Sequence, residues 1–362
     1  MTTTLPKRIV LLYNGYPRLS QTYQIDEAEE LIRRGHTVLI VSWGWELYII
    51  SNTAPPALHV RNPLLPGPLS QIAAFQPDVI HAHYMTNVDV CIQLSNALGG
   101  VPFTIRTHSF DVLGIGHDHF QKAVKSLSGA GAFRGAIIFP SYRERFLAAG
   151  ASSEKLIVSQ PSISVQRFLD AGSTDAAAQA SASWPPTRIM SGGAFLPKKN
   201  IAGFIAIAQK IHEIYPDCEI SYYSVKEAPD YYEKIIALNR AAGNPVIFRT
   251  IQREQMPAEY VRHQWLIYGA CPTLKTVGYP LMIAEAQAAG VGVIAYHLRP
   301  EMADYVTDAG YLYNTPEDII RLIKQPFDAT RRAAARALAA ERYDIRKNIT
   351  ALEDAWDGGS TA

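Results

Sequence analysis

The chain has 362 residues and a net charge of +1, and 48% of its residues are hydrophobic. This length is about twice that of an ordinary domain, so two domains are expected, and the balanced charge argues against a nucleic acid as partner. Three cysteines without metal-ligand spacing, Cys91, Cys218 and Cys271, predict a reducing, cytoplasmic compartment. The apolar runs are too short to span a membrane.

The first half of the chain alternates apolar segments with helical ones. An apolar run at 8–13 precedes the turn-like loop 14–20, a helical stretch at 21–36 and a second apolar run at 37–43. Further apolar segments follow at 77–84, 102–108, 135–141 and 155–161. Such alternation predicts a doubly wound parallel sheet, and ligands bind such a sheet outside the carboxyl ends of its strands.

The segment 171–187 is rich in Ala, Ser and Pro and is typical of a linker or surface insertion. Alternation resumes after it, with apolar segments at 188–195, 218–225, 245–250, 265–271 and 291–296. We therefore expect an α/β protein with two Rossmann-like domains, 1–180 and 181–335, facing across a ligand-binding cleft. The helical tail, 336–362, could cross back to the N-terminal domain.

The segment 275–299 carries one formal charge between its two ends, that of Glu285. Pro280 suits the first turn of a helix and Gly290 suits its C-terminal cap. A carboxylate in such an apolar helix is costly to bury unless a partner is present, so Glu285 is expected to pair with something. The start of this helix would offer backbone N–H groups to an anion, from Gly278, Tyr279 and Leu281.

The sequence "GYPLMIAEAQAAGVGVIAY" around Glu285 resembles the donor-site segment of retaining GT-B glycosyltransferases of family 4. Five other segments resemble the same family in the right order, "YPRLSQTYQIDEAEELIRRGHTV", "PDVIHAHY", "FTIRTHSFDVL", "SYRERFLAAGASSEKLIVSQPSISVQRF" and "SGGAFLPKKNIAGFIAIAQKI". The resemblance is to exopolysaccharide-type members and covers nearly the whole chain. It implies transfer of a sugar from a nucleoside-diphosphate sugar, such as a UDP-sugar, to a hydroxyl of a glycan, a lipid-linked saccharide or a small metabolite. It also implies that no metal or other cofactor is needed.

The resemblance also implies roles for single residues. Glu285 would accept hydrogen bonds from the two ribose hydroxyls, and Lys199 or Lys198 would hold the departing diphosphate together with the helix N–H groups. His108 would contact the donor sugar. Further contacts are expected on the nucleotide-sugar side from Gly193 and Gly15, and on the acceptor side from Arg18, Ser20, Arg106 and Asp111. Asp111 could orient the His108 imidazole or cap the following turn.

The chain departs from the family pattern in the donor half. Ala194 stands at the family's Arg, and Val277 stands at the first Glu of its Glu pair. A lysine cannot replace the bidentate fork of the missing Arg. A catalytically reduced GT-B protein that binds nucleotide or a partner without turnover is therefore an alternative. An epimerase or phosphorylase of the same fold is a third.

Three other features have competing explanations. His81 and His83, at i and i+2, share one face of a strand and resemble a metal pair, but no nearby set of carboxylates or cysteines completes such a site, so no metal is expected. Glu301 is expected to cap the following helix. Four basic residues could face anionic lipid or simply be solvated, which leaves peripheral membrane contact open, and they are Lys122, Lys125, Arg143 and Arg145.

Overall fold

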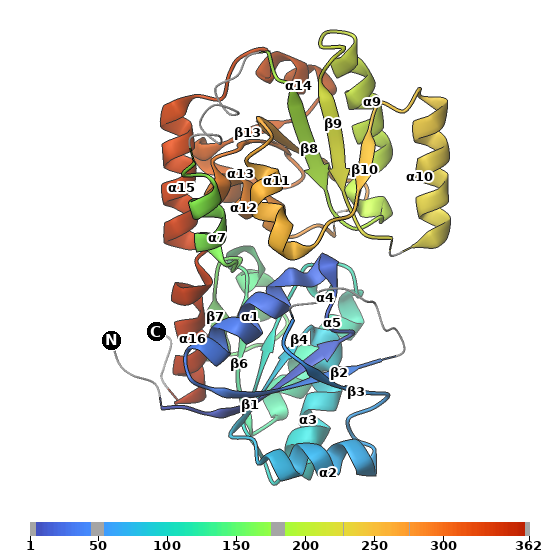
Figure 1. The fold of residues 1–362 in the computed structure, drawn as a ribbon. Coiled ribbons are helices and arrows are strands. Elements are labelled where there is room, and N and C mark those ends of the chain that lie inside the picture. Colours follow the sequence, from blue (N-terminus) through green and yellow to red (C-terminus); the bar gives the residue numbers. More distant parts are fainter. Residues whose placement is uncertain (1–4, 45–53, 175–184, 227, 275, 359–362) are drawn as a thin grey trace. The chain divides into compact units, whose positions relative to one another are not determined.

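The computed structural model describes residues 5–44, 54–174, 185–226, 228–274 and 276–358. It forms two compact units (Figure 1), the first made of Met1–Ser162 with Ile345–Ala362 and the second of Ile163–Asp344. The second unit thus begins at 163, earlier than the expected boundary at 180, because α7 (Val165–Ala171) packs against α12 (Leu281–Ala289). Most of the expected linker, 175–184, lies outside the described residues.

The first unit contains a parallel sheet of seven strands in the order β3-β2-β1-β4-β5-β6-β7. The strands are β1 (Arg8–Asn14), β2 (Thr37–Trp43), β3 (Ala57–Val60), β4 (Val79–His83), β5 (Phe103–Arg106), β6 (Phe133–Ile138) and β7 (Leu156–Val158). The sequence predicted all of them except the edge strand β3. The strand order reverses between β1 and β4, and such a reversal is where ligands bind in sheets of this kind.

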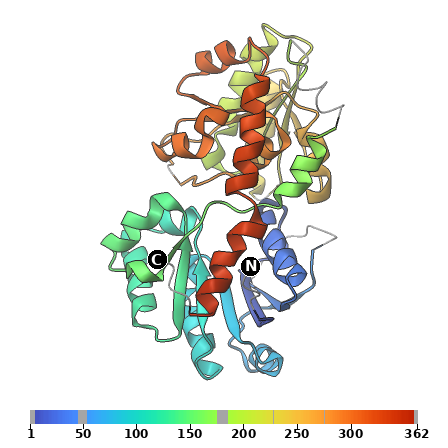
Figure 2. The same ribbon diagram turned by 90° about the vertical axis from the view of Figure 1, so that its left-hand side faces the viewer.

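Both faces of this sheet are buried because successive side chains of a strand point to opposite faces. Ile9 and Leu11 of β1 pack on one face with α1 (Thr22–Arg33) and α16 (Ile345–Trp356), whereas Val10 packs on the other. Figure 2 shows α16, the last helix, lying along the strands. The other helices of the unit are α2 (Pro66–Phe75), α3 (Val88–Ala97), α4 (Phe110–Leu113), α5 (His117–Gly129) and α6 (Arg143–Ala148).

The second unit contains a parallel sheet of six strands in the order β10-β9-β8-β11-β12-β13. The strands are β8 (Arg188–Gly192), β9 (Glu219–Tyr223), β10 (Ile247–Arg249), β11 (Trp265–Tyr268), β12 (Gly292–Tyr296) and β13 (Tyr311–Tyr313). The sequence predicted all but β13, which lies at the edge. The reversal point falls here between β8 and β11, next to the start of α12.

Helices also cover both faces of the second sheet. The face that carries Met190 packs against α7, α12, α13 (Glu301–Val306) and α15 (Ala329–Arg342). The face that carries Ile189 packs against α9 (Ile201–His212), α10 (Pro229–Ala241) and α14 (Pro316–Leu322). The short helix α11 (Met256–Tyr260) contacts α7 and α12. The carboxyl end of β8 lies beside α12, because its last residue, Gly192, is close to Met282 in the first turn of that helix.

The C-terminal tail forms two helices that belong to different units. Helix α15 packs on α12 in the second unit, and α16 packs on α1, β6 and β7 in the first. Glu353 of α16 is buried against His36, with Oε1 2.9 Å from the imidazole Nε2, and it also pairs with Arg34. The first unit is therefore built from both ends of the chain.

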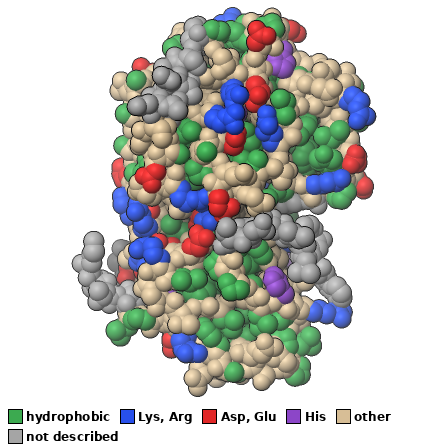
Figure 3. All heavy atoms as spheres, viewed as in Figure 1, with side chains coloured by type: hydrophobic (Ala, Val, Ile, Leu, Met, Phe, Trp, Pro, Cys, Tyr) green, Lys and Arg blue, Asp and Glu red, His purple; other side chains and the backbone are tan. Residues whose placement is uncertain are grey.

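The surface does not gather charge of one sign on the face seen in Figure 3, where basic and acidic side chains are interspersed. In the part of the chain that the structure describes, no helix is both apolar enough and long enough to cross a membrane. Among the basic residues considered for lipid contact, Arg143 pairs with Glu144 and Arg145 lies over the ring of Phe120 at 4.9 Å. Those two side chains thus already interact with other residues of the protein, through an ion pair and a cation–π contact.

Candidate functional site

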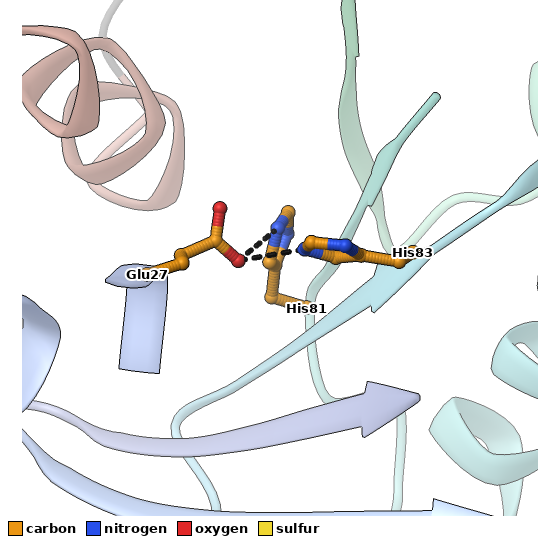
Figure 4. A group of neighbouring side chains, drawn as sticks. All are labelled: Glu27, His81 and His83. Atoms are coloured by element: carbon orange, nitrogen blue, oxygen red, sulfur yellow. Dashed lines mark hydrogen bonds and ion pairs between the residues drawn. The ribbon is translucent and has the colours of Figure 1, made fainter. Parts of the chain in front are cut away.

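A buried cluster of charged and ionisable groups lies at the carboxyl ends of β4 and β5 in the first unit. Glu27 of α1 points its Oε1 at two histidines of β4, 2.7 Å from Nε2 of His83 and 3.2 Å from Nε2 of His81 (Figure 4). Its other oxygen, Oε2, lies 2.7 Å from Nε of Arg106 on β5. The expectation that no carboxylate completes the histidine pair was wrong, because the carboxylate comes from a helix far earlier in the chain.

The charges in this cluster balance. Burial by itself raises the pKa of Glu27, but Arg106 and then His83 lower that pKa well below its ordinary range. Burial lowers the pKa of His83 to about 4 and also lowers that of His81. At neutral pH the cluster therefore consists of one carboxylate, one guanidinium and neutral imidazoles.

Two histidines and a carboxylate are ligand types that divalent metals accept, and these three offer ligand atoms within 4.8 Å of one another. The surroundings do not fit a metal, however. The Arg106 guanidinium already pairs with the carboxylate, and a second cation beside it would be repelled. Both imidazoles are 0% exposed, so the cluster has no open coordination position. Arg106 is thereby committed to Glu27, which is a role that the sequence did not predict.

His108 follows β5 and extends the cluster towards the surface. Its Nε2 lies 3.1 Å from Nδ1 of His83, and its half-buried ring packs against the rings of Tyr23 and Tyr84, with its centroid 4.5 Å from the centroid of each. Tyr84 has a φ of 74°, which is an unusual backbone conformation for a residue with a side chain. Strain of this kind is concentrated at functional sites. Burial and the neighbouring His83 hold the pKa of His108 well below its ordinary value.

Asp111 acts on the backbone of His108 and not on its ring. One carboxylate oxygen accepts the N–H of His108 and the other accepts the N–H of Met85, both at 2.8 Å. The side chain is fully buried, and burial raises its pKa to about 6 despite these hydrogen bonds. The expectation that Asp111 orients the imidazole is corrected: it ties the end of β4 to the turn that carries His108.

The loop after β1 lies at the neighbouring strand end. Gly15 has a φ of +65°, and a side chain there would lie 2.4 Å from a guanidinium nitrogen of Arg18, so Arg18 folds back over the glycine. Ser20 is half-buried in the short helical turn Leu19–Gln21 that leads into α1. The sequence identified this loop but missed Tyr23 and Glu27, although their i, i+4 spacing places both on one face of α1.

In the second unit, the last residue of β8, Gly192, and the glycine that follows it, Gly193, allow a close approach of loop and helix. A Cβ at Gly192 would lie 2.7 Å from the sulfur of Met282 in the first turn of α12, and one at Gly193 would lie 2.9 Å from Cε of Lys199. Lys199 therefore lies over the backbone of Gly193, and its ammonium donates to the hydroxyl of Tyr268 at 2.5 Å. Lys198 is half-buried in the same turn, Pro197–Lys199.

Glu285 lies one turn into α12 and is half-buried rather than buried. Its Oε2 accepts a hydrogen bond of 2.6 Å from the hydroxyl of Tyr260, so part of its polar capacity is satisfied within its own unit. Pro280 is the N-cap of α12 and not its first residue, whereas Gly290 ends the helix with a φ of 76°, as predicted. Of the three expected N–H donors, Gly278 is buried, Tyr279 packs against Tyr305, and Leu281 opens the helix.

The two positions that depart from the family pattern are both buried. Ala194 is 8% exposed and Val277 is 4% exposed, and Val277 belongs to the apolar core of the unit. The carbonyl of Val277 accepts a hydrogen bond of 2.5 Å from Arg299, which also pairs with Glu301 at 2.7 Å. Helix α13 begins at Glu301, and its N-cap is Pro300, so the expectation that Glu301 caps this helix was wrong.

Comparisons with known proteins agree on the fold. No family model and no curated protein sequence matches the chain. Among solved structures, HepE of Anabaena in complex with UDP and glucose matches with a TM-score of 0.71 and 16% identity, over 97% of this chain and 100% of that one. TarM matches with a TM-score of 0.72 and 9% identity, over 99% and 100%. The catalytic domain of starch synthase IV from Arabidopsis thaliana, bound to ADP and acarbose, matches with a TM-score of 0.63 and 10% identity, over 99% and 100%.

These identities are low, so the likeness establishes the architecture. The chain has the GT-B fold, with two helix-covered parallel sheets of seven and six strands. It is structurally similar to glycosyltransferases that use nucleotide sugars, and HepE also matches as its complex with UDP-glucose, with a TM-score of 0.69.

Proposed function

We propose that the protein is a retaining glycosyltransferase of the family 4 type. It would move a sugar from a nucleoside-diphosphate sugar to a hydroxyl of a glycan, a lipid-linked saccharide or a small metabolite. The observation that carries the proposal is the arrangement beside β8, where Lys199 lies over Gly193 and the first turn of α12 lies against Gly192. A cation, a tightly packed glycine loop and a helix N-terminus are together suited to a diphosphate.

The residues would share the chemistry as follows. Lys199, assisted by Lys198 and by the N–H groups at the start of α12, would stabilise the charge that develops on the diphosphate as the glycosidic bond breaks. Glu285 would accept hydrogen bonds from the ribose hydroxyls with its carboxylate, one oxygen of which also accepts from Tyr260. His108 would position the sugar. These groups require no metal, and we include metal independence in the proposal.

Retention would follow from attack on the face that the diphosphate leaves. The carbon–oxygen bond to the diphosphate breaks and a bond from the same carbon to the acceptor oxygen forms. The proton of the acceptor hydroxyl passes to a diphosphate oxygen, so no side-chain nucleophile is needed. The loop with Gly15, Arg18 and Ser20 would contact the donor and acceptor, since it lies at the carboxyl end of β1.

A second function is favoured by a specific observation, the burial of Ala194 and Val277. At these positions the family pattern has an Arg and a Glu that serve the donor. Here both positions contribute to packing instead, and a protein without those two groups could bind nucleotide or a partner without turnover. This alternative makes the same prediction for nucleotide binding but the opposite one for transfer.

Two measurements on the full chain separate these functions. A thermal-shift screen with nucleoside diphosphates and their sugars tests the pocket, and a donor-hydrolysis assay over the same panel tests the chemistry. Stabilisation together with turnover of one donor supports the transferase. Stabilisation without any turnover supports the binding protein, and no stabilisation by any nucleotide would overturn the transferase and the nucleotide-binding protein, leaving only a protein that binds a partner. We propose a cytoplasmic location, with peripheral membrane contact left open, and no nucleic-acid partner.

A further inference from the structure

The tautomeric state of His108 follows from the groups behind it. Glu27 is an ionised carboxylate because Arg106 pairs with one of its oxygens, and an ionised carboxylate only accepts hydrogen bonds. His83 has its Nε2 2.7 Å from the other oxygen. That nitrogen must therefore carry a proton, and His83 donates to Glu27.

The next contact transmits this assignment to His108. His83 is fully buried and neutral, so protonation of its Nε2 leaves its Nδ1 with a lone pair. The Nδ1 atom lies 3.1 Å from Nε2 of His108, and only one proton can occupy this contact. The proton must belong to His108 Nε2, which leaves the Nδ1 of a neutral His108 as an acceptor.

A second chain of contacts, from Trp356 through Thr104 and His81, also ends at the Glu27 carboxylate. We call it the second branch of the cluster; the first runs from His108 through His83. The indole of Trp356 can only donate, and its Nε1 lies 3.0 Å from Oγ1 of Thr104. The Thr104 hydroxyl is then free to donate to Nδ1 of His81 at 2.7 Å. The remaining proton of His81 is thereby placed on Nε2, which faces Glu27. Both branches thus place a proton on the ring nitrogen nearest the same carboxylate, although only His83 makes a hydrogen bond to it, and His81 Nε2 lies 3.2 Å away.

The ring of His108 is also fixed in orientation. It packs against the rings of Tyr23 and Tyr84, whose hydroxyls are hydrogen-bonded to each other at 2.5 Å. Asp111 holds the backbone N–H of His108. The imidazole is therefore held by two aromatic rings and at Nε2, and Nδ1 is the ring nitrogen that remains for a ligand.

We propose that Glu27 and His83 are positioning residues, which hold His108 as a neutral imidazole with its proton on Nε2 and its Nδ1 ready to accept a hydrogen bond from a sugar hydroxyl. The part of this inference that concerns the sugar depends on the proposed transferase function. The tautomer itself does not, and it can be measured without any substrate.

The first test is a long-range proton–nitrogen NMR spectrum of the full chain with nitrogen-15-labelled histidine. At pH 7 the wild-type His108 is expected as the neutral tautomer with the proton on Nε2. Assignment comes from the signals lost in His108→Gln. An imidazolium at His108, or a proton on its Nδ1, would overturn the proposal.

The second test compares two variants of nearly equal size, His83→Asn and His83→Leu. The asparagine oxygen can take the place of Nδ1 and accept from His108, whereas leucine cannot. His83→Asn should therefore keep the Nε2–H signal, and His83→Leu should give a mixture of both tautomers. The matched control is Thr104→Val, which removes a hydroxyl from the other branch and should leave the His108 signals unchanged.

Activity adds a third readout once a donor has been found. The kcat of His83→Leu should fall about tenfold relative to His83→Asn, which corresponds to one lost hydrogen bond in the transition state, with KM for the donor changed less. Equal tautomer signals in the two variants would overturn the positioning role. If both variants show the expected tautomers but neither they nor the wild type transfer sugar from any donor, the proposed function is overturned and the tautomer assignment still stands.

Discussion

The hydroxyl of Tyr260 donates a 2.6 Å hydrogen bond to Oε2 of Glu285, which answers within the second unit the question of what the single carboxylate of 275–299 pairs with. The bond holds one oxygen on the core side of the helix. Because Glu285 is only half-buried, its carboxylate can serve its own fold and a ligand together. A structural role and a nucleotide-binding role are therefore compatible, and they can be separated by substitution.

Replacing Glu285 by Gln should weaken binding of a nucleoside diphosphate at least tenfold, because charge-assisted hydrogen bonds to the ribose are lost. The melting temperature should change little, since an amide oxygen can still accept from Tyr260. Tyr260→Phe is the converse control: it removes the internal hydrogen bond to Glu285 but keeps the carboxylate, so binding should stay within about threefold. Calorimetric titration measures both, and wild-type affinity in Glu285→Gln would contradict the ribose assignment.

Replacing Lys199 by Met should reduce turnover of the donor, because the ammonium beside Gly193 would no longer stabilise the departing diphosphate. A loss of about a hundredfold in kcat is expected for one charged group at such a position. Lys198→Met reports whether its neighbour shares the role. Lys210→Met is the control, since Lys210 is exposed and pairs with Glu317 on the surface. Equal rates in all three variants would rule out this assignment.

The stability of the first unit should fall as the pH drops from about 6.5 to 4. Burial lowers the pKa of His83 to about 4, so in this window the unfolded chain binds a proton that the folded chain does not, and the free energy of unfolding decreases by up to about 3 kcal/mol. The burial of Asp111 raises its pKa to about 6 and opposes this by a similar amount, but burial also lowers the pKa values of His81 and His108, so the net fall comes from the three histidines together. Urea unfolding curves at several pH values measure the slope.

His83→Leu provides the control for this pH dependence, because leucine has no proton to bind. The slope between pH 6.5 and 4 should be shallower in the variant than in the wild type, whatever its absolute stability. Parallel slopes would mean that His83 is already charged in the folded protein.

Restoring the family carboxylate at Val277 should damage the protein rather than improve it. Val277 is 4% exposed within the apolar core, and an unpaired charge at such a place costs about 3–5 kcal/mol. Val277→Glu should therefore lower the midpoint of guanidinium unfolding strongly, whereas Val277→Leu should change it little. A glutamate variant that is as stable as the wild type and turns over donor faster would show that the position faces the sugar.

Removal of divalent metals should leave nucleotide binding and turnover unchanged. The only metal-like group found among the described residues is Glu27 with His81 and His83, and Arg106 occupies its carboxylate. Dialysis against a chelator followed by metal analysis and assay tests this expectation. Activity that disappears and returns with one added metal would contradict it.

The order of the elements could be predicted from the sequence because apolar strands and helices differ in period and length. The edge strands β3 and β13 were missed, since strands of only four and three residues with mostly half-buried side chains give too short an apolar signal. Gly193 and the Glu285 helix were predicted from the family resemblance, and the structure brings the neighbouring Gly192, which was not predicted, against Met282 of that helix.

The buried cluster could not be predicted, and the reason is physical. Its groups come from α1, β4, β5 and α16 and meet only when the sheet forms. From the local sequence, His81 and His83 were therefore interpreted as a pair without a carboxylate, and Arg106 was predicted to contact the acceptor. Each is explained by a partner distant in the chain.

The return of α16 to the first unit has a consequence for the order of synthesis. The sheet face that carries Ile9 and Leu11 is covered in part by Ile349, Leu352 and Trp356, which are synthesised after the whole second unit. Until then the nascent first unit exposes an apolar face, and its Thr104 lacks the indole that donates to it. The first unit is thus begun before the second and completed after it, and the histidine cluster acquires its full set of hydrogen bonds only once α16 has been made.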